Sequence, residues 1–423
     1  MIFIYSLILY LLTPVVLIRL LWRSLWLPAY RQRIGERFGI GISISSVAPV
    51  IWIHAVSVGE TQAAIPLVNS LRANYPAMQI LFTTTTPTGS ERVRSVFGDN
   101  VIHYYAPYDL PDVVRRFLNQ ARPRLVIILE TELWPNLLYF CRRRAIPVIL
   151  ANARLSIRSF RGYQYIFYLA CFTVRQFSTI ATQSLHDAQR FQQLGALPKQ
   201  IRVTGNIKFD LDIPQNIERD AEKLRELLGE HRPIWIAAST HKGEEALILN
   251  AHTLILHRHP SALLILVPRH PERFQEVAQL CRNFNFSIHV WSDQTVVPSH
   301  CKVYLGNTVG RLLLFYAVAD AAFVGGSLVE HGGHNPLEPA ALAIPIVFGP
   351  HGFNFSEINR LLCTAGGAYE VRNEKILAVT ISDWLENPPL RREIGERARQ
   401  VIESHRGALI ALMKIIAEQI DVN

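Results

Sequence analysis

From residue 49 onward the chain alternates short apolar runs with longer amphipathic stretches. Runs in which almost every position is apolar are typical of strands buried on both faces of a parallel sheet, with helices covering each face. The runs that predict strands are VIWIHAV, QILFTTT, RLVIILE, IPVILAN, STIATQ and IRVTGN in the first half, and PIWIAAS, ALLILVP, KVYLGN, AAFVGG and IPIVFG in the second. The pattern therefore predicts an α/β protein with two parallel sheets.

A polar, acidic segment at residues 209–231 separates the two series of strands and contains no run long enough for another. We therefore place the domain boundary there. The predicted ranges are a membrane-anchor helix at 1–25, an N-terminal Rossmann-like domain at 26–208, a linker at 209–231 and a C-terminal Rossmann-like domain at 232–423. Residues 391–420 have helical periodicity and predict one long amphipathic helix, a candidate to pack back on the N-terminal domain.

The first residues of the chain differ from the rest because positions 2–18 contain no charge. Counted as far as Trp22, this run is long enough to cross a bilayer. No basic residue precedes it and no small-residue cleavage site follows it, which argues against a signal peptide. Arginines interleaved with Trp and Tyr follow it, which places the rest of the chain in the cytoplasm. A core helix of the first domain is the alternative, but we interpret the run as a membrane anchor.

Composition narrows the class of function. The 43 Lys and Arg against 34 Asp and Glu give a formal charge of +9, which favours anionic partners such as phospholipid headgroups, phosphorylated substrates or nucleic acid. The five cysteines never form a CxxC pair, which favours a reducing compartment and argues against structural zinc. No GxGxxG follows a strand, and neither GxxxxGK[ST] nor GxSxG occurs. Nicotinamide, P-loop and α/β-hydrolase chemistry is therefore not supported, and we expect neither cofactor nor metal.

The most informative strand end is GGSLVEHGGHNPLEP, residues 325–339. Ligands of parallel sheets bind beyond the carboxyl ends of the strands. Here Asn335, Pro336 and Glu338 match the N-cap, N1 and N3 positions of a helix, whose N-terminus would suit a nucleotide phosphate or a carboxylate. Glu338 is equally explained as a capping residue. Glu330 lies eight residues earlier, where no capping role explains it.

Two further strand ends carry candidate chemistry. Ser57 and Glu60 have the spacing of a capping box, so Glu60 is either a cap or a general base whose carboxylate the helix N-terminus stabilises. Arg269 directly follows a predicted strand, where its guanidinium would bind a phosphate through two hydrogen bonds. A weak salt bridge at the rim of the site is the alternative for Arg269.

Several long stretches of the chain resemble the 3-deoxy-D-manno-octulosonic acid (Kdo) transferases of Gram-negative lipopolysaccharide synthesis. The resemblance extends over essentially the whole length and is carried by PAYRQRIGERFG, HAVSVGETQAAIPLV, FTTTTPTGSERV, ETELWPN, ANARLS, TGNIKFD, VPRHPERF and FVGGSLVEHGGHNPLEPAA. It implies the GT-B glycosyltransferase fold, in which two Rossmann-like domains face a cleft.

The resemblance also implies a reaction. An inverting, metal-independent glycosyltransferase would move Kdo from CMP-Kdo to the tetraacylated, bisphosphorylated lipid A precursor (lipid IVA) at the cytoplasmic face of the bacterial inner membrane. The expected partners are CMP-Kdo, lipid IVA and inner-membrane phospholipid, with no nucleic acid and no obligate protein partner. Both substrates are anionic and one is embedded in the bilayer, which agrees with the basic charge and the anchor.

Carried over by motif, Glu60 corresponds to the catalytic base of the family. Arg269 and the backbone amides around Asn335 are candidates to stabilise the leaving phosphate. Glu330 and Glu338 fit the E-x7-E spacing of GT-B donor sites, where the second glutamate holds ribose hydroxyls. The predicted donor-binding residues are Arg269, His270, Gly325, Gly326, Ser327, Glu330, Asn335 and Glu338. The candidates for the acceptor or the transition state are Ser57, Gly59, Glu132, Arg154 and Lys208.

Two other functions are compatible with parts of this pattern. One is a different GT-B enzyme, either a UDP-sugar transferase or a sugar-nucleotide epimerase, which competition by UDP rather than CMP would reveal. The other is a membrane-anchored protein that binds anionic lipid without catalysis and releases no CMP. Gly, Glu and Arg after strands in both domains favour an enzyme.

Overall fold

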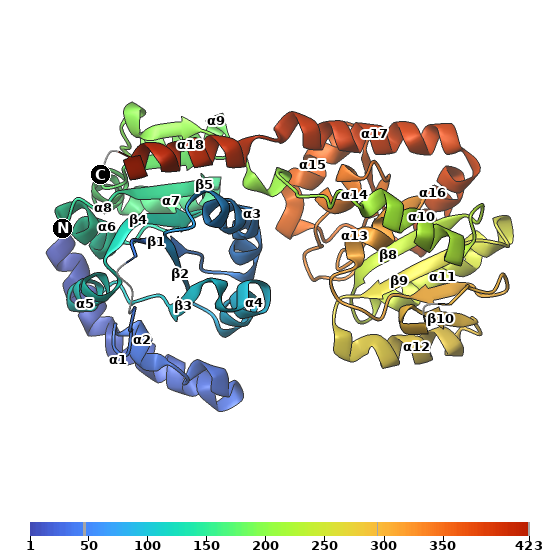
Figure 1. Ribbon diagram of the computed structural model, residues 1–423, viewed down its shortest axis with the longest axis horizontal. Helices are drawn as coiled ribbons and strands as arrows, with labels where there is room; N and C mark the ends of the chain where they lie inside the picture. Colours follow the sequence, from blue (N-terminus) through green and yellow to red (C-terminus); the bar gives the residue numbers. More distant parts are fainter. Residues whose placement is uncertain (45–47, 294, 422–423) are drawn as a thin grey trace. The chain divides into compact units, whose positions relative to one another are not determined.

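The computed structural model describes residues 1–44, 48–293 and 295–421. Its contacts divide the chain into two compact units (Figure 1). Unit 1 contains Met1–Asp210 and the last helix, and unit 2 contains Leu211–His405. The predicted linker 209–231 includes a helix of unit 2, and the predicted range 232–423 does not form one unit, because the last helix belongs to unit 1.

Unit 1 is built on a seven-stranded parallel sheet with the strand order β3-β2-β1-β4-β5-β6-β7. Alternate residues of the central strand pack into different clusters: Trp52 packs with Phe117, whereas Ile51 packs with Leu67 and Leu412. The apolar runs therefore fill two layers of core, one on each face. The strands are β1 (Val50–His54), β2 (Gln79–Thr84), β3 (Ile102–Tyr105), β4 (Pro123–Leu129), β5 (Val148–Ala153), β6 (Thr179–Thr182) and β7 (Ile201–Val203).

The helices of unit 1 connect these strands and cover the sheet (Figure 1). They are α1 (Ile2–Trp26), η1 (Pro28–Tyr30), α2 (Ile34–Arg37), α3 (Val58–Asn74), α4 (Pro87–Phe97), η2 (Gly98–Asn100), α5 (Pro111–Ala121), α6 (Pro135–Arg143), α7 (Ile157–Tyr165), α8 (Phe167–Val174), α9 (Leu185–Gln193), η3 (Pro198–Gln200), η4 (Ile207–Phe209) and α18 (Ala408–Asp421). Leu412 of α18 is fully buried in the core beside β1, so the last helix completes this unit.

Unit 2 repeats the parallel architecture with the order β10-β11-β9-β8-β12-β13-β14. Its strands are β8 (Ile234–Thr240), β9 (Leu263–Pro268), β10 (Ile288–Val290), β11 (Val303–Leu305), β12 (Ala321–Val324), β13 (Ile346–Phe348) and β14 (Ala368–Glu370). Its helices are α10 (Ile217–Leu228), α11 (Glu244–Arg258), η5 (Pro271–Arg273), α12 (Phe274–Asn283), η6 (Trp291–Asp293), α13 (Leu312–Ala317), α14 (Leu337–Ala341), η7 (Phe353–Phe355), α15 (Ser356–Thr364), α16 (Glu374–Glu386) and α17 (Pro388–His405).

Three strands were not predicted by the apolar runs: β3, β10 and β14. All three lie at the edge of a sheet, and each has three or four residues that are mostly half-buried or exposed. An edge strand has a neighbour on one side only, so its sequence need not be uniformly apolar. The pattern therefore predicted interior strands better than edges.

The prediction of one long C-terminal helix was wrong, because the structure has two helices with a break at residues 406–407. Gly407 has a φ of 103°, a conformation that glycine adopts without strain. The carboxylate of Asp210 accepts hydrogen bonds from the backbone amides of Gly407 and Leu409, each at 2.7 Å. This long-range cap starts α18 afresh and ends unit 2 at His405.

The N-terminal helix α1 is long enough and apolar enough to cross a membrane, with a mean hydropathy of 2.1 over its most apolar window. Only 6% of that window is buried, although a core helix would be mostly buried. The alternative of a core helix is therefore wrong.

Candidate functional site

Each sheet has a topological switch point, where the strands on either side lead away in opposite directions. It lies between β1 and β4 in unit 1 and between β8 and β12 in unit 2. In open parallel sheets ligands bind beyond the carboxyl ends of strands at this point. Glu60 follows β1, and the glycine-rich loop at 325–328 follows β12.

Glu60 occupies the first turn of α3 and is buried, with 9% of its surface exposed. Ser57 is the N-cap: its hydroxyl accepts a bond from the Glu60 amide at 3.2 Å and donates to the Glu60 carboxylate at 2.9 Å. The other carboxylate oxygen accepts from the Val56 amide at 2.7 Å. Gly59, which lies between Ser57 and Glu60 in the sequence, is exposed. Glu60 therefore has the geometry of a cap.

The environment of Glu60 also changes its acidity. The pKa of Glu60 is raised to about 7, mainly by burial and in smaller part by the carboxylates of Glu130 and Glu132. The hydrogen bonds from Val56 and Ser57 oppose this shift. A carboxylate with a pKa near neutrality is suited to general-base catalysis, which a cap alone does not require.

Glu130 was not among the predicted site residues, although it directly follows β4. It forms an ion pair with Lys208 at 3.1 Å, and both side chains are about a quarter exposed. Its φ of 58° is unusual for a residue with a side chain and could have marked it only once the backbone was known. Asn152 holds the Lys208 loop, because its side-chain oxygen accepts from the Ile207 amide at 3.1 Å.

The other predicted residues of unit 1 lie around this group. Glu132 accepts a hydrogen bond from the Trp134 indole at 2.7 Å, and burial raises its pKa. Arg154 is exposed, directly after β5, and its carbonyl accepts a hydrogen bond from the Thr131 hydroxyl. The structure thus gathers three carboxylates and one lysine at the carboxyl ends of β1 and β4.

In unit 2 the central feature is a carboxylate that sequence analysis did not select. Glu244, fully buried at the start of α11, accepts hydrogen bonds from the amides of Gly326, Ser327 and Leu328 at 2.7–3.0 Å. It also accepts from the amide of His241 at 3.2 Å. The amide of the remaining loop residue, Gly325, donates to Ala238 at 2.8 Å.

Gly325, Gly326 and Ser327 were predicted to bind the donor, which stays a prediction; the structure shows that their backbone amides have partners within the protein. Ser327 is 1% exposed, and its hydroxyl donates to the Val324 carbonyl and accepts from the Gly349 amide. A Cβ at Gly325 would stand 2.7–2.9 Å from the Ser239 carbonyl and the Glu244 carboxylate. Gly325 is therefore required for packing.

The segment after this loop brings Asn335 and Glu338 together. The Asn335 side chain accepts from the Leu337 amide at 3.2 Å and donates to Glu338 at 3.3 Å. Burial raises the pKa of Glu338, while Asn335 and the charge of Arg269 oppose the shift. Helix α14 has only five residues, so the predicted anion site at its N-terminus has little helix dipole behind it. Glu330 is exposed.

Four histidines and two arginines converge beside these residues. His241 stacks on His331 with ring centres 4.2 Å apart, and its Nε2 lies 2.7 Å from the Nε2 of His334. The centre of the His270 ring lies 5.4 Å from the centre of the His241 ring. Burial, the neighbouring histidines and Arg269 and Arg273 lower the pKa of His241 to about 4. Sequence analysis selected Arg269 and His270 but missed His241.

The cations of this cluster differ in exposure and pairing. Arg269 and His270 are exposed, and His270 lies 3.7 Å from the Glu272 carboxylate. Arg273 instead forms two bonds to the buried Glu245, at 2.6 and 3.2 Å. The described residues contain no group of three or more His, Cys, Asp and Glu arranged to hold a metal ion. The side chains of Arg269 and His270 are exposed and thus accessible to a ligand.

Comparisons with known proteins agree with this geometry. Residues 32–211 match the family described as 3-deoxy-D-manno-octulosonic-acid transferase (kdotransferase), and residues 231–401 match glycosyl transferases group 1. The 3-deoxy-D-manno-octulosonic acid transferase of Haemophilus influenzae is 44% identical over 423 residues, which cover 100% of this chain and 99% of that protein. Its Bordetella pertussis counterpart is 34% identical over 91% of this chain and 90% of that protein.

Solved structures resemble the chain at the level of the fold. The UDP-GlcNAc 2-epimerase from Neisseria meningitidis bound to UDP-GlcNAc has a TM-score of 0.55 and 13% identity, covering 89% of this chain and all of that one. The prediction of a GT-B glycosyltransferase with two parallel-sheet domains is confirmed, as is the prediction of an enzyme. The chain belongs to the family of 3-deoxy-D-manno-octulosonic acid transferases.

Proposed function

We propose that the enzyme transfers Kdo from CMP-Kdo to the tetraacylated, bisphosphorylated lipid A precursor, with inversion, without a metal and with Glu60 as general base. The observation that carries this proposal is the Glu60 carboxylate at the switch point of unit 1, with a pKa of about 7. A base of this acidity is about half ionised at neutral pH, so it is available to accept a proton and strong enough to take one.

The proposed reaction proceeds in one displacement. Glu60 accepts the proton of the acceptor hydroxyl while that oxygen forms a bond to the anomeric carbon of Kdo, and the bond from that carbon to the CMP phosphate oxygen breaks. The phosphate leaves with the electron pair on the opposite face, which inverts the configuration. Lys208 is proposed to stabilise developing negative charge, while its ion pair with Glu130 fixes its position.

Unit 2 is proposed to bind the CMP part of the donor. Arg269 is an exposed cation at the end of β9, suited to a phosphate, and His270 is exposed beside it. Glu338, which Asn335 orients, is proposed to hold the ribose hydroxyls. Glycines 325 and 326 and Ser327 are assigned to the support of this site, because Ala238 accepts from the Gly325 amide, Glu244 accepts from the amides of Gly326 and Ser327, and Gly349 donates to the Ser327 hydroxyl.

The alternatives are less well supported. A protein that binds lipid without catalysis does not agree with membership of a transferase family. The likeness to a UDP-sugar epimerase has 13% identity and concerns the fold alone. Relatives at 44% and 34% identity over nearly the whole chain are instead Kdo transferases.

We further propose that the enzyme acts at the cytoplasmic face of the inner membrane, held there by α1. The support is one exposed apolar helix with arginines at positions 19 and 23 in its C-terminal part and at position 31 beyond it. Such arginines favour the cytoplasmic leaflet, which is rich in anionic lipid. This position would bring the active site to a lipid acceptor.

The decisive experiment compares two caps of the same geometry. Asp187 in α9 repeats the arrangement of Glu60: Ser184 accepts from its amide at 3.2 Å and donates to its carboxylate at 2.5 Å. Glu60→Gln should lower the rate of CMP release from CMP-Kdo and lipid IVA by about 10²–10⁴-fold. Asp187→Asn should keep nearly the full rate. Glu60→Gln should lose on the order of 1 kcal/mol of stability. Asp187→Asn should lose more, because it also weakens the ion pair between Asp187 and Arg190 at 3.2 Å.

Both variants are assayed in detergent beside wild type, and their thermal unfolding is measured. Nearly normal turnover by Glu60→Gln, with reduced stability, would leave Glu60 as a cap only. Absence of Kdo transfer by wild type would contradict the proposed substrates.

A further inference from the structure

Helix α1 has two faces of unusual composition. The residues that are not fully exposed recur every three to four positions along its whole length: Ile2, Tyr5, Ser6, Leu9, Thr13, Leu17, Leu20 and Ser24. This spacing defines one stripe of a helix, which we call the inner stripe. It contains all the serine and threonine residues of α1, among which Ser6 and Ser24 are buried.

The opposite face of α1, the outer stripe, is apolar and exposed. It contains Phe3, Leu7, Leu11, Val15, Ile18, Trp22 and Trp26, each of which is 59–87% exposed. A helix on the surface of a water-soluble protein has the reverse arrangement, with its apolar stripe against the core. The outer stripe of α1 is therefore built to face a medium other than water.

The N-terminal part of α1 is hydrogen-bonded to unit 1. The Tyr5 hydroxyl donates to the buried carboxylate of Asp109 at 2.9 Å, and the Ser6 hydroxyl donates to the side chain of Asn136 at 3.0 Å. One turn later, the Tyr10 hydroxyl donates to Asp112 at 2.5 Å. The hydroxyls of Tyr5, Ser6 and Tyr10, which would otherwise be polar groups inside a bilayer, thus have hydrogen-bond partners in unit 1.

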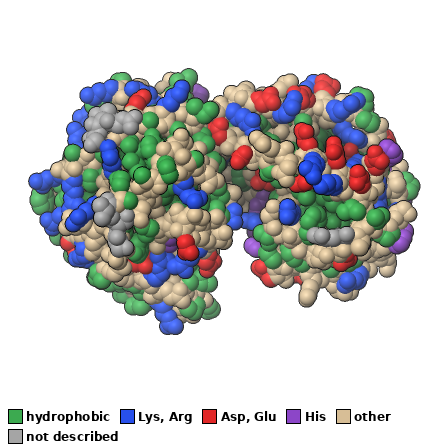
Figure 2. All heavy atoms as spheres, viewed as in Figure 1, with side chains coloured by type: hydrophobic (Ala, Val, Ile, Leu, Met, Phe, Trp, Pro, Cys, Tyr) green, Lys and Arg blue, Asp and Glu red, His purple; other side chains and the backbone are tan. Residues whose placement is uncertain are grey.

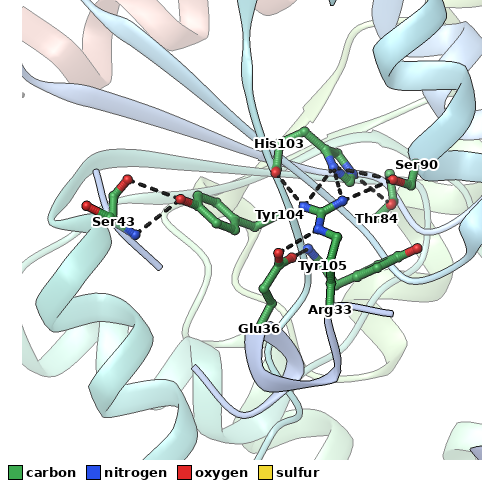
Figure 3. A network of polar contacts seen from close by, with 8 residues as sticks. All are labelled: Arg33, Glu36, Ser43, Thr84, Ser90, His103, Tyr104 and Tyr105. Carbon is green, nitrogen blue, oxygen red and sulfur yellow. Dashed lines mark hydrogen bonds and ion pairs between the residues drawn. The ribbon is translucent and has the colours of Figure 1, made fainter. Parts of the chain in front are cut away.

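The C-terminal end of α1 is attached to the same unit. Its last turns pack against η1, where the guanidinium of Arg23 lies 5.6 Å from the centre of the Tyr30 ring. Three residues beyond η1, Arg33 enters the network shown in Figure 3. Its guanidinium donates to the His103 carbonyl at 2.7 Å and pairs with Glu36, which accepts from the backbone of β3.

The N-terminal part of α1 is therefore hydrogen-bonded to unit 1, and its C-terminal end leads within seven residues to Arg33, which is held in the same unit. A helix of 25 residues is roughly 37 Å long, and a helix that crosses the hydrocarbon core, about 30 Å thick, has its ends on opposite sides. We propose that α1 does not cross the membrane but lies in the plane of an anionic bilayer surface, with the outer stripe among the acyl chains and the inner stripe on unit 1. This inference rests on the proposed membrane association and determines its geometry.

The charges and aromatic residues around α1 indicate a lipid surface rather than a protein partner. Arg19 and Arg23 are exposed beside the outer stripe, and α6, which packs against α1, ends in three arginines. Figure 2 shows green hydrophobic and blue basic side chains together along the lower edge of unit 1, where Figure 1 places α1. Arginines beside Trp and Tyr are typical of the headgroup region.

A second exposed patch extends this surface. Helix α6 also packs against α8, and at the junction of α7 and α8 the side chains of Tyr165 and Tyr168 are 92% and 74% exposed. Arginines accompany the aromatic rings between these helices: Arg115 lies 5.5 Å from the Phe140 ring and Arg143 lies 5.7 Å from the Tyr139 ring. An in-plane helix would bring such a neighbouring patch to the same interface.

The topology is tested with the full chain bound to the outside of sealed vesicles of phosphatidylcholine with 30 mol% phosphatidylglycerol. The exposed Cys363 and half-buried Cys171 are replaced by Ser, and a short polar tag with one cysteine is added before Met1; the remaining cysteines are buried. An in-plane α1 leaves this tag in the water outside the vesicle, where a membrane-impermeant thiol reagent added outside labels it. Protection of the tag until detergent is added would overturn the proposal.

Depth measurements provide an independent test. Nitroxide labels at Leu7→Cys, Leu11→Cys, Val15→Cys and Ile18→Cys should report one shallow depth. A spanning helix would instead give a gradient of roughly 16 Å between the first and last label, at 1.5 Å per residue, and would overturn the proposal.

The lipid partner is tested with a matched pair of substitutions in unit 1. Leu11 on the outer stripe is 69% exposed and Ile410 on α18 is 65% exposed. Leu11→Glu should weaken vesicle binding on the order of tenfold or more, whereas Ile410→Glu should leave it unchanged. Arg19→Gln with Arg23→Gln should weaken binding about fivefold per residue, and only to anionic vesicles.

Three outcomes distinguish the membrane association of α1, its in-plane geometry and the partner of its outer stripe. No binding of wild type to vesicles would remove the membrane association itself, and the in-plane geometry with it. Binding with a protected N-terminal tag would leave the association and overturn only the geometry. Vesicle binding that Leu11→Glu does not change, together with loss of a dimer in that variant, would assign the outer stripe to a second copy of the chain instead of lipid.

Discussion

Glu60 and Glu244 occupy equivalent places in the two units. Each follows the first strand at a switch point and lies in the first turn of the next helix. Glu244 accepts four backbone hydrogen bonds and has no exposed surface, so its carboxylate is committed to holding a loop. Glu60 accepts one backbone hydrogen bond to its carboxylate, at Val56, and lies near two other carboxylates.

Residue type and position do not decide whether a carboxylate at a strand end has a structural or a catalytic role. The hydrogen-bond partners of the carboxylate decide it. A carboxylate whose oxygens are filled by amides cannot accept a proton from a substrate without losing those bonds. Glu60 keeps a cap interaction but has a raised pKa, so it combines a fixed position with the ability to accept a proton.

The largest expected effect in this comparison concerns the stability of the loop. Glu244→Gln removes the charge that accepts four amides, and hydrogen bonds to charged groups contribute about 1.5–3 kcal/mol each. Because Gln retains one acceptor oxygen, we expect a loss of about 3 kcal/mol, against about 1 kcal/mol for Glu60→Gln. Urea unfolding followed by tryptophan fluorescence measures both. Amide exchange of residues 326–328 should accelerate only in Glu244→Gln; unchanged exchange would contradict the structural role.

A smaller effect is expected from the glycines that accompany these two glutamates. Gly325→Ala would place a Cβ 2.7–2.9 Å from two carbonyl oxygens and the Glu244 carboxylate, and overpacking of this kind costs about 1–3 kcal/mol. Gly59→Ala is the matched control, because the nearest atom to its Cβ would be the Ser57 hydroxyl at 3.8 Å. We expect Gly59→Ala to change stability by less than about 1 kcal/mol. Equal destabilisation by the two changes, measured by thermal unfolding, would refute this account.

The next prediction concerns the pH dependence of the reaction. A general base works when ionised, so kcat/KM should fall about tenfold per pH unit below about 7 and reach a plateau above it. Lys208→Met leaves the negative charge of Glu130 uncompensated and should move this limb to higher pH. Glu130→Gln removes that charge and should move it to lower pH. Rates measured from pH 5.5 to 8.5 test the signs; shifts in the same direction would contradict the assignment to Glu60.

The smallest effect is expected at the histidine pair of unit 2. In the free protein burial and nearby cations lower the pKa of His241 to about 4 and of His334 to about 3. A bound phosphate would raise both values, so binding of CMP at pH 5.5 should take up part of a proton. The groups that face the pair are His270, His331, Arg269 and Arg273. Lys242 and Glu244 follow His241 in the chain. Glu272 lies beside His270, and Glu338 is near Arg269.

Calorimetry in two buffers of different ionisation enthalpy measures this uptake. The phosphate of CMP itself titrates near pH 6, so the informative quantity is the difference between proteins. His241→Gln should take up fewer protons than wild type, whereas His300→Gln, at an exposed position elsewhere in unit 2, should match wild type. The same proton number in all three proteins would refute the linkage.

Much of the fold was predictable because its signals are local. Interior strands are apolar along their whole length since both faces are covered, whereas the edge strands β3, β10 and β14 lack that signal. The C-terminal helix appeared continuous because the carboxylate that interrupts it, Asp210, lies almost 200 residues earlier. A periodicity within 30 residues contains no trace of such a partner.

By itself, the sequence determined the two parallel sheets, the apolar first helix, the cap at Ser57 and the family, because each depends on residues close together in the chain or on long motifs. Only the tertiary structure decided which carboxylates have partners within the protein. It paired Glu130 with Lys208, bound Glu244 to the glycine loop and brought His241 to His334. It also attached the N-terminal part of α1 to unit 1. These outcomes depend on burial and on partners distant in sequence, and electrostatic interactions and pKa values follow those surroundings rather than residue type.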